Sequence, residues 1–191
     1  YGSGGSQVAK ILAERKGVWC YDRDILTIAA ERIGNEELTE DTINDLNYKR
    51  NDVASAGITG VMGMGNIPIY NQMFLEQAKI IRKLANYGSA VFLGRCADYI
   101  LKDIKNCTSV YLYADREFRK NRVKEIYGSN AEIMDKEEKN RADYYNYYTG
   151  NRWGDINNYD FAINTSKVSF EEAADLIYRF AKDKQKNLKD R

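Results

Sequence analysis

The strongest constraint on the fold is the alternation of short apolar runs with longer helical patterns along the chain. This alternation is typical of a parallel sheet flanked by helices, and continuous apolar runs suit strands that are covered on both faces. We therefore predict an α/β sandwich. Four strands are visible, at residues 17–21, 90–93, 109–114 and 160–163.

Helical spacing of apolar residues is clearest over 72–87, and Gly88 follows where a helix C-cap is favoured. Ser169 is predicted to cap the last helix, with Glu171 and Glu172 in its first turn. We predict a charged, fraying tail over 182–191. The predicted helices are 8–15, 24–33, 72–87, 116–127 and 170–181.

Two segments interrupt the alternation. Residues 35–71 contain an acidic helical stretch and then closely spaced glycines, a pattern that predicts a mobile loop over a site. Residues 127–155 are rich in tyrosine, and the spacing of the tyrosines covers more than one helical face. Some of them must pack internally, and the others are left for solvent or for stacking on a base. The residues concerned are Gly57, Gly60, Gly63, Gly65, Tyr144, Tyr145, Tyr147 and Tyr148, with a turn expected at 153–155.

Composition limits the chemistry. The chain has 29 Lys and Arg against 28 Asp and Glu, so a formal charge of +1 gives no overall attraction to nucleic acid or membrane. It has no histidine and three cysteines without a CxxC pair, which argues against Ser-His catalysis, a zinc site and a disulfide framework. No apolar run is long enough to span a bilayer. We expect a single cytoplasmic domain over 1–191.

The glycine-rich start runs directly into the first predicted helix. Glycines let backbone N–H groups converge, and the helix N-terminus adds positive charge, so residues 2–7 are a candidate phosphate cradle; a flexible linker is the alternative. Because such a loop normally follows a strand, we expect a first, central strand before Tyr1. The cradle residues are Gly2, Ser3, Gly4, Gly5, Ser6 and Gln7.

Arginines mark a second candidate region. Arg95 follows a predicted strand, at the sheet edge where α/β proteins bind ligands, and its guanidinium can grip a phosphate; a surface arginine is the alternative. Arg119 and Arg122 are three residues apart, as are Glu138 and Arg141. Pairs with this spacing lie on one helix face, and solvated salt bridges explain them equally well.

Taken together, these pieces resemble the cytidylate kinase-like family of P-loop nucleoside monophosphate kinases. The resemblance is carried, in chain order, by YGSGGS, VAKILAERKG, VWCYDRDIL, AVFLGRCADYIL, SVYLYADREFRKNRV, EKNRADYYNYYTGNRWGD and NYDFAINTS. It implies a three-layer P-loop NTPase-like fold, with a parallel sheet of about five strands flanked by helices. It also implies a helical lid over residues 127–155.

The resemblance also implies roles for individual residues. Residues 2–7 would hold the donor phosphates, and Asn164 and Thr165 would lie near the donor base. Arg119, Arg122 and Arg141 would neutralise charge on the transferring group, and Glu138 with Arg141 would match the Asp-x-x-Arg of the lid, which also contains Lys139. The acceptor nucleotide would meet Asp22, Arg95, Cys96 and Asp98.

The sequence departs from true cytidylate kinases at the donor side. Gly5 stands where those enzymes carry the phosphate-loop lysine, and Ser6 or Gln7 stands in place of the metal-binding hydroxyl. Cys96 replaces an aspartate of the acceptor site. Lys10 or Lys139 could supply the missing positive charge.

The resemblance predicts transfer of a phosphoryl group from ATP, with Mg²⁺, to a nucleoside monophosphate or a similar small acceptor. The missing lysine keeps an alternative open, a nucleotide-binding or regulatory domain without catalysis. Nucleic-acid binding through the tyrosines is opposed by the net charge, and no membrane partner is expected.

Overall fold

The computed structural model describes residues 1–34, 69–128 and 130–189. The predicted glycine-spaced loop at 57–65 and its acidic stretch lie outside these residues. In chain order the elements are α1 (Gly5–Lys16), β1 (Trp19–Tyr21), α2 (Asp24–Ile33), α4 (Ile69–Tyr87), β2 (Ala90–Phe92), α5 (Ala97–Ile100), β3 (Val110–Tyr113), α6 (Arg116–Tyr127), α7 (Ala131–Thr149), a short 3-10 helix (Ile156–Asn158), β4 (Phe161–Asn164) and α8 (Phe170–Lys189).

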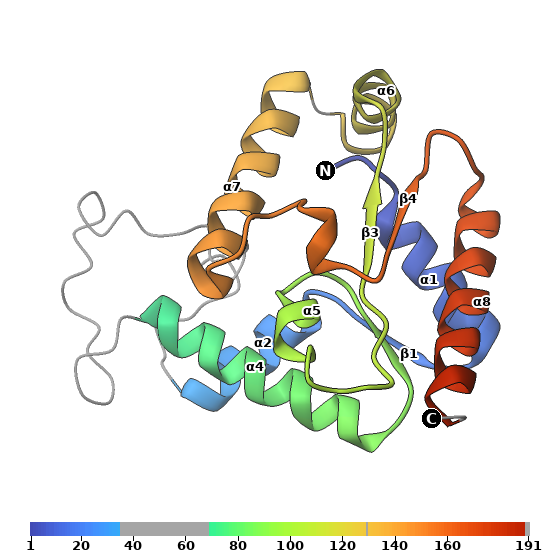
Figure 1. Cartoon of the computed structure of the whole chain (residues 1–191). Coiled ribbons are helices and arrows are strands. Elements are labelled where there is room, and N and C mark those ends of the chain that lie inside the picture. The colour runs from blue at the N-terminus through green and yellow to red at the C-terminus, as the bar shows by residue number, and fades with distance from the viewer. Residues whose placement is uncertain (35–68, 129, 190–191) are drawn as a thin grey trace.

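The described strands form two parallel pairs (Figure 1). In the first pair Trp19 of β1 lies opposite Ala90 of β2, and in the second Val110 of β3 lies opposite Phe161 of β4. The four strands predicted from the sequence are therefore confirmed, each shortened or shifted by a few residues. The fold is mixed α/β and mostly helical. Four strands are present in the described part of the chain, so a five-stranded sheet is not shown.

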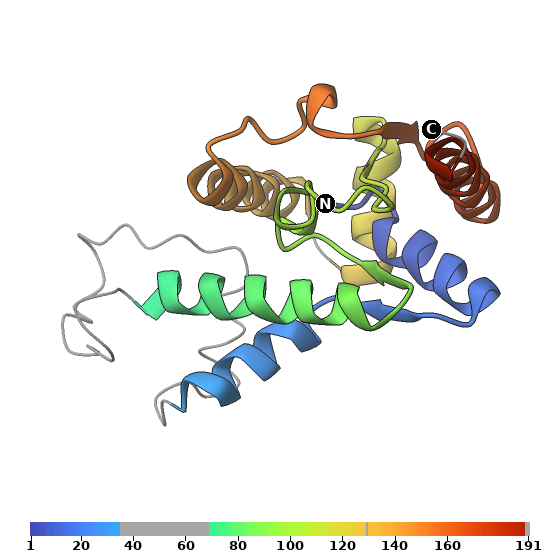
Figure 2. The same ribbon diagram turned by 60° about the horizontal axis from the view of Figure 1, so that its bottom comes forward.

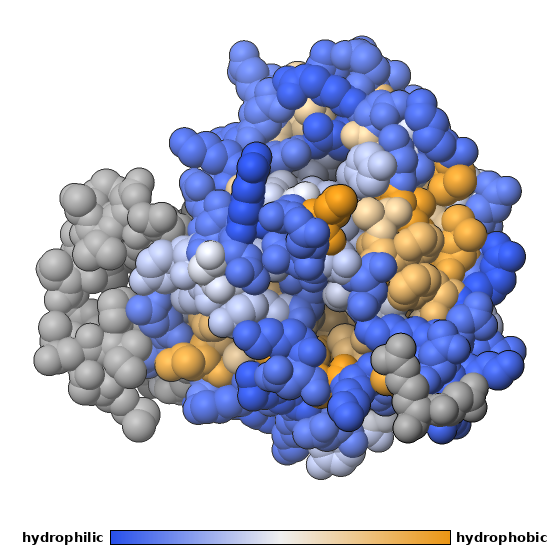
Figure 3. Space-filling model, viewed as in Figure 1, coloured by the Kyte–Doolittle hydropathy of each residue, from blue (hydrophilic) through white to orange (hydrophobic). Residues whose placement is uncertain are grey.

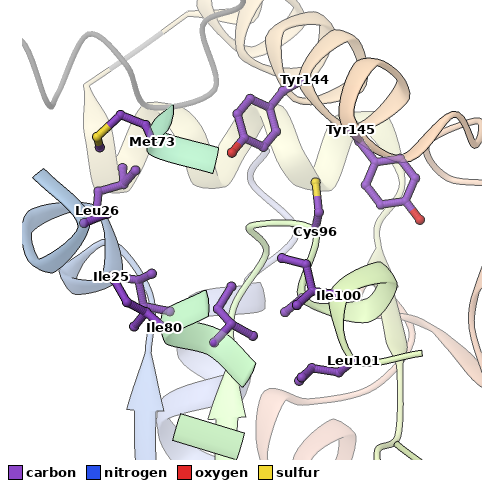
Figure 4. Packing of buried hydrophobic residues seen from close by; sticks show 12 residues of the cluster. Ile25, Leu26, Met73, Ile80, Cys96, Ile100, Leu101, Tyr144 and Tyr145 are labelled. Carbon is purple, nitrogen blue, oxygen red and sulfur yellow. The ribbon is translucent and has the colours of Figure 1, made fainter. Parts of the chain in front are cut away.

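Helices cover the strand pairs in two groups. α1 packs against α8, and α2 packs against α4, as both ribbon views show (Figures 1 and 2). The first group shares an apolar cluster with β3 and β4 that includes Val8, Ile163 and Ile177, and apolar surface is visible where these elements meet (Figure 3). The second group forms a larger cluster with α5 and α7 (Figure 4).

Local sequence signals fix several helix ends. The Asn130 side chain accepts a hydrogen bond from the Ile133 N–H at the start of α7, and Ser169 and Glu172 form a reciprocal capping box at the start of α8. The prediction of a fraying tail from residue 182 was wrong, because α8 continues to Lys189. Lys184 explains part of this, since its ammonium group donates to the Cys107 carbonyl and to Asp160.

The glycine-rich start of the chain meets the carboxyl ends of both strand pairs. A side-chain carbon at Gly5 would lie 3.7 Å from Leu93, which follows β2. The Ser3 carbonyl accepts a 2.7 Å hydrogen bond from Thr165, which follows β4. The fold therefore places this loop at the edge where parallel sheets bind their ligands.

Candidate functional site

The glycine loop is a packed part of the structure and not a free linker. Gly4 is buried, and its φ of 81° and that of Gly2, 82°, are conformations that side chains disfavour. A side-chain carbon at Gly4 would lie 2.6 Å from Phe170 Cζ, and one at Gly2 would lie 3.0 Å from the Arg119 carbonyl oxygen. The loop can make these close approaches only because both residues are glycine.

Two side chains hold the carbonyl groups of this loop. Thr165, which is 2% exposed, donates to the Ser3 carbonyl at 2.7 Å or to the Tyr113 carbonyl at 3.1 Å. Arg122 donates from Nε to the Gly2 carbonyl at 3.2 Å, and its guanidinium lies 4.6 Å from the centre of the Phe170 ring. These contacts fix the path of the loop into α1.

The N-terminus of α1 is suited to an anion. Its N-cap is Gly4, no side chain caps it, and its first turn contains no acidic residue. The partial positive charge of the helix end is therefore not neutralised locally. Ser6 and Gln7 lie half-buried in this first turn. The loop predicted as a cradle over residues 2–7 therefore leads into a helix N-terminus without a side-chain cap.

Arg95 occupies a strained turn between β2 and α5. Gly94, Arg95 and Cys96 have φ values of 68°, 58° and 55°, and a left-handed conformation is uncommon in residues other than glycine. Arg95 is 2% exposed, so the alternative of a surface arginine is wrong. Burial of a guanidinium is costly unless charges or hydrogen bonds compensate, which marks this turn as a candidate functional feature.

Asp22, directly after β1, lies within electrostatic range of Arg95 and of Arg141 of α7. Burial raises the pKa of the Asp22 carboxyl, and the nearby charges of Arg95 and Arg141 oppose that rise. The structure therefore brings together three residues that are far apart in the sequence.

The neighbours of Arg95 also contact α7. Burial raises the pKa of the Cys96 thiol, so the thiol is neutral at physiological pH. The Tyr145 hydroxyl donates to Asp98 at 2.6 Å; burial raises the pKa of this carboxyl, and the hydrogen bond opposes the rise. Figure 4 shows Tyr144 extending from α7 toward the region of Cys96. The loop after β2 and the tyrosine-rich helix therefore pack together in the larger apolar cluster, with the hydrogen bond between Tyr145 and Asp98 beside it.

Arg119 and Arg122 make different contacts although they lie one turn apart on α6. Arg119 forms an ion pair with Glu138 of α7, whereas Arg122 contacts the glycine loop. Arg119 Nε is buried without a hydrogen-bond partner among the described residues. The Arg141 guanidinium lies 5.3 Å from the centre of the Tyr1 ring. The arginines of α6 and α7 therefore surround the start of the loop.

A groove of about 360 Å³ lies between α6 and α7. Asp135, Glu138, Lys139 and Ala142 recur at helical spacing, so one face of α7 lines it. Lys10, the other candidate for the missing charge, is exposed on α1. Burial raises the pKa of the Cys20 thiol in β1, and the charge of Lys10 opposes that rise. The groove is lined by Arg116, Arg119, Asp135, Glu138, Lys139, Ala142 and Trp153.

Some predicted residues serve mainly as supports. The Asn164 side chain donates to Asp115 and accepts from Ser166, and Thr165 holds the loop. Tyr144 and Tyr145 are buried, while Tyr147 is 52% exposed, which confirms that the tyrosines divide between packing and surface.

Sequence reasoning missed Phe170 as the partner of Gly4 and Arg116 and Trp153 as groove residues. No sequence pattern marked Phe170 as a site residue; it was notable only for its position directly after the Ser169 helix cap. The described residues contain no group of three or more side chains that could hold a metal, and none of the helices in this part of the chain is long and apolar enough to cross a membrane.

The fold and this site define a mixed α/β protein with a packed glycine loop that leads into a helix N-terminus beside several arginines. The model of the cytidylate kinase-like family matches residues 1–167, and the chain belongs to that family. It is also similar to the crystal structure of an uncharacterized protein from Eubacterium ventriosum ATCC 27560, with 28% sequence identity and a TM-score of 0.69 over 95% of this chain and 93% of the other. No curated protein matches the chain.

Proposed function

We propose that this protein transfers the terminal phosphoryl group of ATP to a nucleoside monophosphate or a similar small acceptor. The observation that carries the proposal is the convergence of the uncapped α1 N-terminus with arginines from three segments. Arg122 and Arg119 contact the glycine loop, and the charges of Arg95 and Arg141 both act on Asp22. Phosphoryl transfer is catalysed mainly by positioning and by charge stabilisation, which arginines can supply without histidine.

Each part of the site has a role in this reaction. The loop over residues 2–7 would hold the donor phosphates, and Arg95 would hold the acceptor phosphate. An acceptor oxygen attacks the γ-phosphorus, the bond between that phosphorus and the β-phosphate oxygen breaks, and ADP leaves. Arg119, Arg122 and Arg141 would balance the charge on the transferring group.

The residues present fit Mg²⁺ bound together with ATP. Mg²⁺ keeps several water ligands and is usually held by substrate phosphates with only one or two protein oxygens. The Ser6 hydroxyl in the first turn of α1 and the Asp22 carboxylate are the protein oxygens that would serve. When bound, Mg²⁺ would neutralise phosphate charge in the transition state.

A nucleotide-binding domain without catalysis is the second candidate. It is favoured by Gly5, which stands in the first turn of α1 where a lysine would contact the donor phosphates. This candidate requires tight nucleotide binding without turnover, so the two candidates differ in one measurable property.

Phosphate transfer from ATP to a panel of nucleoside monophosphates in the presence of Mg²⁺ tests the first candidate. We expect transfer to at least one of them. Arg95→Lys keeps the charge but loses the planar guanidinium, so it should raise KM for the acceptor by about tenfold and leave KM for ATP unchanged. Arg179→Lys, on the exposed surface of α8, is the matched control. Calorimetric binding of ATP without any transfer would favour the second candidate.

A further inference from the structure

The first turn of α1 lacks a positively charged side chain that could act on donor phosphates. The turn contains Gly5, Ser6 and Gln7, and Lys10 is exposed on the side of β1. A polyphosphate bound at the helix N-terminus would therefore depend on a cation from another element. The groove between α6 and α7 is lined by three cationic side chains, those of Arg116, Arg119 and Lys139.

This groove adjoins the glycine loop through Arg119. The Arg119 main chain packs against Gly2, and its side chain lines the groove. Ala142 and Trp153 give the groove an apolar wall beside its charged one. It therefore combines the two surfaces that a nucleotide needs, a cationic surface for phosphates and a flat apolar surface for a base.

The charges in the groove are unevenly paired. Arg116 forms a bidentate ion pair with Asp135, at 2.9 and 2.6 Å, and Arg119 pairs with Glu138. Lys139 lines the same groove and forms no ion pair with any carboxylate in the described ranges. Its ammonium group is the groove cation that can bind a phosphate without first breaking an ion pair.

We propose that Lys139 of α7 binds the β- or γ-phosphate of the donor nucleotide and replaces the lysine that the glycine loop lacks. The proposal rests on the proposed function and names the residue that completes its donor site. Lys139 remains protonated through the transfer, and its charge stabilises the β-phosphate oxygen that leaves with ADP. A long, flexible side chain on a separate helix suits this role, because an ammonium group acts as a mobile point charge.

Fluorescence of Trp153 provides a binding test that does not require turnover. The chain has two tryptophans, and Trp19 is 75% exposed on β1, so Trp19→Phe leaves Trp153 as the single reporter within the groove. ATP and AMP are titrated into this protein and into variants made in the same background. AMP lacks the β- and γ-phosphates, so a variant that loses only contacts to those phosphates weakens binding of ATP and leaves binding of AMP unchanged, whichever site AMP occupies.

We expect Lys139→Met to raise Kd for ATP by about tenfold or more, as loss of a charge-assisted contact should, with little change for AMP. It should also lower kcat, and Lys139→Arg should recover part of both. Lys136→Met, one turn earlier on α7 and outside the groove, is the matched control and should stay within about twofold of the parent. Both lysines are exposed, so thermal unfolding should be unchanged.

The outcomes separate this inference from the proposed function. If the parent binds ATP and transfers phosphate while Lys139→Met behaves like Lys136→Met, the role of Lys139 is overturned and the proposed function stands. Binding without transfer, weakened by Lys139→Met, supports the inference and rejects catalysis. A parent that neither binds ATP nor transfers phosphate overturns both.

Discussion

Single residues explain how the glycine loop reaches its position. Gly4 is buried against the ring of Phe170, and its φ of 81° adds a second reason for glycine. The Arg122 guanidinium lies 4.6 Å from the centre of the same ring. One aromatic side chain therefore supports both the loop and an arginine of the site, so a change at Gly4 should disturb more than local packing.

Gly4→Ala is expected to lower the free energy of unfolding by about 2 to 4 kcal/mol, because steric overlap with Phe170 adds to the cost of a left-handed alanine. Gly17→Ala is the control, since Gly17 has a φ of 62° but no atom within 4 Å of the added carbon. The control should lose only about 1 kcal/mol. Urea unfolding measures both, and equal losses would exclude a role for Phe170.

At the scale of elements, the ends of β3 and β4 are joined to the loop and to α8. Thr165 follows β4 and donates to the Ser3 carbonyl, while Asp160 precedes β4 and accepts from Ser109, which precedes β3, and from Lys184 of α8. The pair β3 and β4 is therefore held at both ends by polar side chains. The contact at the carboxyl end holds the glycine loop of the site. The contacts at the other end hold the two strands and α8 together.

Thr165→Val should raise KM for ATP severalfold and cost about 1 to 2 kcal/mol of unfolding free energy, because the Ser3 carbonyl loses its donor. Thr165→Ser keeps the hydroxyl and should restore both values. Thr149→Val is the matched control: Thr149 is also buried and donates to a carbonyl, that of Tyr145, away from the loop. Steady-state kinetics with an equal rise in KM for both valine variants would contradict a positioning role for Thr165.

Asp160→Asn should reduce stability in a pH-dependent way. Burial by itself would raise the pKa of the Asp160 carboxyl, but the hydrogen bonds from Lys184 and Ser109 hold it below its ordinary value of 3.8. A lowered pKa in the folded state stabilises the protein above that ordinary value, and the stabilisation is lost as pH falls through the lowered pKa.

We therefore expect Asp160→Asn to lower the unfolding free energy by about 1 kcal/mol at neutral pH and by much less in strong acid. Denaturant unfolding at several pH values measures the difference. Asp183→Asn, on the exposed surface of α8, is the matched control for loss of a carboxylate. A constant difference for Asp160→Asn across pH would show that its charge contributes nothing.

At the scale of the whole molecule, the described strands form two separate parallel pairs. β2 pairs with β1 and β3 pairs with β4, so in the described part of the chain each inner strand has one strand partner. The glycine loop contacts Leu93 after β2 and Thr165 after β4, which places the start of α1 between the pairs. The loop therefore links the carboxyl ends of the two strand pairs.

The sequence by itself determined the elements of this protein and the family to which it belongs. The four described strands, the main helices and the Ser169 cap follow from apolar spacing and local hydrogen-bonding preferences, which act over a few residues. Gly2 and Arg95 were also identified, because glycine before a helix and arginine after a strand are local patterns. The extension of α8 to Lys189 was not predicted from the sequence. It involves contacts of Lys184 with Cys107 and Asp160, which are distant in the sequence.

Only the tertiary structure decided which partners the candidate residues have. Glu138 and Arg141 have the spacing of a helical pair, yet Glu138 pairs with Arg119 of another helix. Lys10 and Lys139 were equal candidates in the sequence. The packing of α6 against α7 places Lys139, and not Lys10, in the groove. The physical reason is that charge compensation and close contact depend on distances between distant segments, and these are set when the helices pack around the sheet.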